Sequence, residues 1–214
     1  MSGTVLRTAL RRSLAQIRYV DPVRPAAATG LVADVYRQME DEFGMVAPPV
    51  ALHSPAPAVL AATWLMLRET LLAGGHAGRA AKEAVAASVS VANACPYCVE
   101  VHATALRGLD ARSAADALGA GRVDDVDDPA ISVLAEWARY TGDRARGYAV
   151  PAPAEQAPEL VGVAATFHYL NRMVNVFLAE SPLPPGAPDA AKNVARWLLV
   201  KVMRPSVRRA PGLS

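Results

Sequence analysis

The chain has 214 residues, of which 22 are Lys or Arg and 20 are Asp or Glu, so its formal net charge is +2. A charge this small does not indicate a nucleic-acid partner. Hydrophobic residues make up 52% and aromatics only 6%, a balance that favours closely packed helices over a β-sandwich. No apolar run reaches the roughly 18 residues of a spanning helix, and the first residues lack the apolar segment of a secretory signal. We therefore expect no membrane span and a cytoplasmic location.

Basic residues gather near both ends of the chain and predict three parts. Residues 1–30 are expected to form a basic N-terminal arm, residues 31–204 a single helical domain, and residues 205–214 a basic C-terminal tail.

Helical spacing of apolar residues begins at Leu31 and stops at Gly44. The proline-rich stretch that follows is expected to be a connector, with Ser54 and Pro55 opening the next helix. Asp128 is expected to cap a later helix. No alternating strand pattern is found, so the prediction is an all-α fold. Helical segments are expected at 31–44, 58–75, 77–94, 95–110, 111–121, 131–143, 157–180 and 190–203.

The segment "NACPYCVEVH" contains both cysteines of the chain. Pro96 favours a helix start with Cys95 at its N-cap. Both cysteines would then lie near free N–H groups and the positive end of the helix dipole, which favour thiolate. Cys98 and His102 are four residues apart, so they share a face with Cβ atoms ~6 Å apart. The imidazole is therefore placed to take the proton of the Cys98 thiol.

Glu83 lies on the preceding predicted helix. If the two helices pack antiparallel, this carboxylate approaches His102, orients the ring and stabilises its charged form. The result would be a base-activated thiol with a second thiol to resolve its oxidised form.

Other interpretations of the pair are weaker. A c-type haem site needs histidine directly after the second cysteine, where this chain has Val99. A thioredoxin-like domain needs strands around the motif. Zinc could use the two cysteines and His102, but a fourth ligand must come from His168 or His53. Buried, inert cysteines are the remaining alternative. We expect no metal.

The pattern Glu83, eleven residues, Cys95-x-x-Cys98-x-x-x-His102 resembles the AhpD-like alkylhydroperoxidases of the carboxymuconolactone decarboxylase superfamily. The resemblance implies an all-α helical bundle, assembled as a homo-oligomer (dimer, trimer or hexamer), that reduces organic hydroperoxides without a cofactor. It also implies that Cys98 attacks the peroxide, Cys95 forms the disulfide, His102 relays the proton and Glu83 supports His102. The reductant would be a dithiol or a lipoyl-bearing partner.

One position departs from the family pattern. Tyr97 stands where many of these peroxidases have histidine before the second cysteine, and a phenol is a poor base at neutral pH. Decarboxylases of the superfamily generally lack the CxxC motif, so its presence argues against a lactone substrate. The alternatives that stay open are a zinc-stabilised or redox-sensing oligomer without turnover, and a decarboxylase-like enzyme.

The segment "FHYLNRMVNVF" predicts an amphipathic helix with Phe167 and Val174 on its core face. His168 and Asn171 lie on another stripe and are candidates for substrate binding, together with Tyr97. A solvated or subunit-facing surface is the alternative for this stripe.

A weak internal repeat is also present. Glu83 precedes Cys95 by twelve positions, and Glu159 precedes Asn171 by twelve. A degenerate duplicated helical unit would produce this pattern, and chance explains it equally well.

Overall fold

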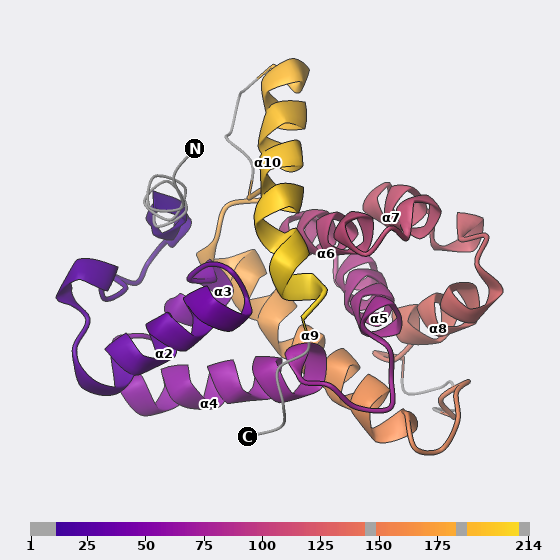
Figure 1. The fold of residues 1–214 in the computed structure, drawn as a ribbon, viewed down its shortest axis with the longest axis horizontal. Coiled ribbons are helices and arrows are strands. Elements are labelled where there is room, and N and C mark those ends of the chain that lie inside the picture. Colours follow the sequence, from indigo (N-terminus) through magenta and orange to yellow (C-terminus); the bar gives the residue numbers. More distant parts are fainter. Residues whose placement is uncertain (1–11, 144–148, 183–187, 210–214) are drawn as a thin grey trace.

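The computed structural model describes residues 12–143, 149–182 and 188–209. All regular elements in these ranges are helical (Figure 1), which confirms the all-α prediction. None of the helices in the described part of the chain combines the length and apolar character needed to cross a bilayer.

The first helices form one side of the molecule in Figure 1. They are α2 (Gly30–Glu42), the short α3 (Pro48–Ala51), and α4 (Pro57–Leu67), which continues into a π-helical turn, Arg68–Leu72. The expected start of α4 at Ser54 and Pro55 is wrong. Helix α4 begins two residues later, at Pro57, and the Ser54 hydroxyl accepts a hydrogen bond from the backbone N–H of Val23 (2.7 Å).

The next four helices are α5 (Arg79–Ala92), α6 (Pro96–Gly108), α7 (Arg112–Gly119) and α8 (Pro129–Arg139). The Asp128 carboxylate accepts hydrogen bonds from the N–H groups of Ala130 and Ile131, so the predicted cap is confirmed. Helix α5 is buried without interruption from Lys82 to Ser90, since α6, α8 and α9 all pack on it. A polar side chain on α5 is thus enclosed on several sides.

The last two helices are α9 (Ala157–Phe177) and α10 (Asp189–Val207). Helix α9 packs against α5 and buries Phe167 and Val174, as predicted. Helix α10 packs against α6. It extends past the expected domain boundary at residue 204 and contains Pro205 in its last turn. Residues 210–214 of the expected tail lie outside the described residues.

The described part of the N-terminal arm is packed on the domain. Two short 3-10 turns, Arg12–Gln16 and Pro25–Ala27, precede α2. Leu14 is buried in the main core, and the Tyr36 hydroxyl donates to the carbonyl of Val23 (2.9 Å). Residues 1–11 of the expected arm lie outside the described residues.

Candidate functional site

A tight turn between α5 and α6 places the cysteines. Asn93 caps the end of α5, and Cys95 is the N-cap of α6 with Pro96 as the first helical residue, as predicted. Ala94, between them, has φ of 48°. This left-handed conformation costs a residue with a Cβ about 1–2 kcal/mol. The packing of α5 and α6 therefore holds the turn in a shape that Ala94 does not favour by itself.

Both cysteines are buried free thiols: Cys95 is 1% exposed and Cys98 is 4% exposed. They belong to a small apolar cluster at the start of α6, apart from the main core. The backbone N–H of Cys95 donates to the carbonyl of Ser90 (2.9 Å). The other members of the cluster are Leu52, Tyr97, Val174 and Leu178.

The two neighbouring thiols shift each other's acidity in opposite directions. The influence of the Cys98 thiol lowers the pKa of Cys95 more than burial raises it. The influence of the Cys95 thiol raises the pKa of Cys98, and burial and the charge on Cys95 raise it further. These directions favour thiolate on Cys95, whereas the sequence led us to expect it on Cys98.

The predicted carboxylate–imidazole pair is present. Glu83 Oε2 lies 2.6 Å from His102 Nδ1, and both side chains are buried. Arg79 donates to the other oxygen, Oε1, at 2.7 Å. Burial alone would raise the pKa of Glu83, but the charges of Arg79 and His102, with their hydrogen bonds, outweigh it and lower the pKa. The carboxylate therefore stays ionised and holds the ring through Nδ1.

The His102 ring packs edge-on against Phe167, with ring centroids 4.4 Å apart. Among the described residues, its hydrogen bonds include none to Cys98. Transfer of a proton from Cys98 to His102 thus needs a movement or a bridging molecule and remains a prediction.

The three substrate-binding candidates are held within the protein by burial or by hydrogen bonds. Tyr97 is 3% exposed, and its pKa is raised by burial and by the nearby cysteines, so it stays a neutral phenol. Asn171 is fully buried. His168 Nδ1 is bound to Asn93 (3.1 Å) and its Nε2 to Thr141 (2.9 Å). None of the three candidates lines the cavity described next, and their role in substrate binding stays a prediction.

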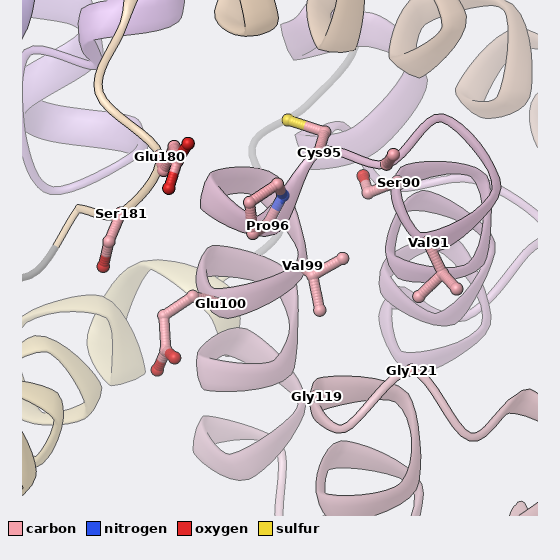
Figure 2. Close-up of a pocket in the computed structure, with 11 residues that line it drawn as sticks. Ser90, Val91, Cys95, Pro96, Val99, Glu100, Gly119, Gly121, Glu180 and Ser181 are labelled. Atoms are coloured by element: carbon pink, nitrogen blue, oxygen red, sulfur yellow. The ribbon is translucent and has the colours of Figure 1, made fainter.

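An open cavity of about 410 Å³ reaches the turn (Figure 2). Cys95 is the cysteine in its wall, next to apolar surface from Val91, Pro96 and Val99. The acidic lining residue Glu100 is neutralised by Arg196, whose Nε lies 2.6 Å from its carboxylate. The rest of the lining is Ser90, Ala94, Gly119, Gly121, Glu180 and Ser181.

The ligands considered for zinc do not come together in the described part of the chain, which contains no group of three or more metal-ligating side chains. Of the two candidates for a fourth ligand, His168 is hydrogen-bonded to Asn93 and Thr141. His53 Nε2 lies 2.7 Å from the Tyr169 hydroxyl, and its Nδ1 lies 3.0 Å from the carbonyl of Val50.

Sequence reasoning missed two contributors to the site. The pairing of Arg79 with Glu83 could have been predicted, since the two residues are four positions apart on a predicted helix. The contact of Asn93 with Asn171 joins residues 78 positions apart, and no local pattern signals it.

Residues 58–140, from α4 to α8, match the carboxymuconolactone decarboxylase family model. A curated relative, an alkyl hydroperoxide reductase from Mycobacterium tuberculosis, is 40% identical over 180 residues. This match covers 84% of the chain but 51% of the relative, so the chain spans about half the length of that protein.

A solved structure shares the fold. It is the AhpD core of an uncharacterized peroxidase-related protein from Ralstonia eutropha JMP134, with a TM-score of 0.58 at 21% identity. The match covers 74% of this chain and 92% of the other. Together with the sequence matches, this agrees with the predicted helical bundle and with the resemblance seen in the motif. Residues 58–140 thus match the carboxymuconolactone decarboxylase family, and the chain resembles AhpD-like proteins in sequence and fold.

Proposed function

We propose that this chain is a thiol-dependent peroxidase that reduces organic hydroperoxides through Cys95 and Cys98. The observation that carries the proposal is the pair of free, neighbouring thiols with Cys95 in the wall of an open cavity. The name of the mycobacterial relative, an alkyl hydroperoxide reductase, supports the same activity.

The proposed cycle has three steps. A thiolate attacks the terminal peroxide oxygen, the O–O bond breaks, and the leaving alkoxide takes a proton to become an alcohol. The sulfenic acid formed on that cysteine is attacked by the other thiol, which gives a disulfide and water. An external dithiol then reduces the disulfide through a mixed disulfide and is itself oxidised.

The attacking sulfur is the point on which the motif and the geometry differ. The family resemblance assigns attack to Cys98. The cavity wall and the lowered pKa favour Cys95, because the nucleophile must be both ionised and reachable. Cys98 is then the thiol that stabilises the Cys95 thiolate and afterwards closes the disulfide.

In this proposal Glu83 and His102 provide the proton relay. The Glu83 carboxylate fixes His102 through Nδ1, which leaves Nε2 as the nitrogen that can exchange a proton. Movement of the ring, or a molecule between the groups, would connect it to the thiol pair.

Peroxide reduction by the wild-type chain and by Cys95→Ser, Cys98→Ser and the double variant tests the proposal. With cumene hydroperoxide and excess dithiothreitol, the wild type should turn over and the double variant should not. Without reductant, Cys98→Ser should consume one equivalent of peroxide and form sulfenic acid on Cys95, while Cys95→Ser reacts at least about tenfold more slowly.

Three outcomes contradict parts of this scheme. Rapid consumption of one equivalent of peroxide by Cys95→Ser, and not by Cys98→Ser, would show that Cys98 is the attacking cysteine. Turnover in the double variant would show that the reaction does not require the cysteines. A disulfide that forms once, without turnover under excess dithiol, would make the pair a redox sensor and overturn the peroxidase.

A further inference from the structure

The charged side chains in the wall of the Cys95 cavity are two carboxylates. Glu100 lies on α6, one turn after Pro96, and Glu180 is an exposed residue that follows α9. In the view of Figure 2, both carboxylates lie to one side of Pro96 and Val91 lies to the other. No Lys, Arg or His is among the described residues that line the cavity. The wall is therefore acidic or neutral, and never basic, along its described length.

The basic residue Arg196 on α10 is bound to one of these carboxylates. Its Nε donates to Glu100 Oε1 at 2.6 Å, and its Nη2 donates to Glu100 Oε2 at 3.0 Å. The third nitrogen, Nη1, donates to Asn193 Oδ1 at 2.9 Å. Each nitrogen of the guanidinium thus has an acceptor within the chain, and the bidentate geometry fixes its orientation. The positive charge of Arg196 is used by Glu100 and is not available to an anionic ligand.

The surface next to the Cys95 sulfur is apolar. Val91, Pro96 and Val99 belong to the same wall as the cysteine. Beyond them, a Cβ added to Gly121 would meet no atom within 4 Å, so the cavity has open space where α7 has ended. An alkyl or aryl group bound near the sulfur would bury apolar surface against these side chains. A carboxylate on that group would instead meet like charge and lose water without gaining a partner.

We propose that Glu100 and Glu180 make the Cys95 cavity selective for uncharged, apolar hydroperoxides, and that Glu100 keeps Arg196 from binding the carboxylate of an anionic one. This inference rests on the proposed function for the identity of the substrate. The selectivity is a difference between two binding free energies: the uncharged molecule gains from apolar contact, and the anionic one is repelled.

Two alkylating reagents that differ in charge measure this selectivity without any peroxide. Iodoacetamide is neutral, and iodoacetate is an anion of nearly the same size. With either reagent the thiolate sulfur of Cys95 forms a bond to the methylene carbon and iodide leaves. In the reduced full-length chain at pH 7.5 and low salt, mass spectrometry quantifies alkylation at Cys95. The ratio of the iodoacetamide rate to the iodoacetate rate should be about tenfold larger than the same ratio for the free thiol N-acetylcysteinamide.

Glu100→Gln should lower this ratio about tenfold, because it releases Arg196 to bind the carboxylate of iodoacetate. Glu100→Gln combined with Arg196→Gln should lose most of that effect, which separates binding by the released guanidinium from a general loss of negative charge. Glu180→Gln removes one carboxylate and should lower the ratio about threefold. Equal ratios in Glu100→Gln and in the combined variant would overturn the role given to Arg196.

The matched control is Asp34→Asn, which removes a carboxylate from an exposed ion pair with Arg37 on α2. Neither residue lines the cavity, so this variant should keep the ratio within about twofold of the wild type. Circular dichroism identifies the variants that are folded. Glu180→Gln, at an exposed position, keeps the inference testable if Glu100→Gln does not fold.

The corresponding measurement with substrates compares cumene hydroperoxide with its para-carboxylate derivative. The wild-type kcat/KM should be about tenfold higher for the uncharged compound, and Glu100→Gln should narrow this difference. A wild-type alkylation ratio equal to that of the free thiol, or ratios unchanged in folded Glu100→Gln and Glu180→Gln, would overturn the inference. Selective alkylation without peroxide turnover in the wild type would overturn the proposed function and leave the charge selectivity of the cavity standing.

Discussion

Glu83 and His102 form a buried 2.6 Å hydrogen bond between two helices that the turn at Ala94 folds back on each other. Arg79 pairs with the other oxygen of the carboxylate. Since Glu83 is 1% exposed, hydrogen bonds from these two partners replace its contact with water. The stability of the α5–α6 pair and the order of the proposed relay thus depend on the same carboxylate.

Glu83→Gln should destabilise the chain by about 3 kcal/mol, because it leaves the partly buried Arg79 guanidinium without a counter-charge. Urea unfolding followed by circular dichroism at pH 7 measures the difference. A surface ion pair, Arg37 with Asp34, provides the control: Arg37→Ala should change stability by less than about 1 kcal/mol.

The loss of stability caused by Glu83→Gln should depend on pH. The folded state lowers the pKa of this carboxyl, so its contribution is full above the ordinary glutamate pKa of about 4.3 and is lost as pH falls through the folded-state value. The stability difference between wild type and Glu83→Gln should therefore shrink between pH 5 and pH 2. A constant difference over this range would contradict the ionised carboxylate.

The sequence predicted the parts of this site that have local signals. Pro96 marked the start of α6, and the spacing of Cys98 and His102 put them on one helical face. The approach of Glu83 followed from pairing two consecutive helices. The features that the sequence could not reveal depend on long-range packing. The opposite influence of the two thiols on each other's acidity depends on how they are packed, and Asn171 contacts Asn93 in the turn because α9 packs across α5.

Ala94→Gly should stabilise the chain by up to about 1 kcal/mol, since glycine adopts a positive φ without the Cβ clash that alanine suffers. Thermal unfolding would record this as an increase in Tm. The matched substitution Ala165→Gly, at an exposed position inside α9, should lower stability by about 1 kcal/mol. A decrease in Tm for Ala94→Gly would show that the turn does not carry backbone strain.

Lys82→Met should cost several kcal/mol. Lys82 is 2% exposed and pairs with Glu159 (2.8 Å), which also accepts from the backbone N–H groups of His76 and Ala77. Removing the ammonium leaves this partly buried carboxylate uncompensated and loosens the loop before α5. Chemical denaturation measures the loss. A cost below about 1 kcal/mol would mean that the pair behaves as a surface ion pair.

Tyr97→Phe should leave the pH profile of peroxide reduction unchanged between pH 6 and 9, because burial and the neighbouring cysteines raise the pKa of the phenol. Steady-state rates at constant ionic strength test this. A profile that loses an ionisation in Tyr97→Phe would show that the phenol exchanges a proton in the reaction.

The cavity at Cys95 should set the size of the hydroperoxide that reacts. Val99 lies one turn after Cys95 on α6 and lines this cavity, so Val99→Phe adds a ring where a bulky alkyl group would enter. We expect kcat/KM for cumene hydroperoxide to fall about tenfold or more, an effect of steric exclusion, while hydrogen peroxide retains its rate within about twofold. Val133→Phe, on the exposed face of α8, controls for added apolar surface. Equal losses with both peroxides would show that Val99→Phe disturbs the thiol pair itself, and unchanged rates with both would mean that substrates reach the sulfurs by another route.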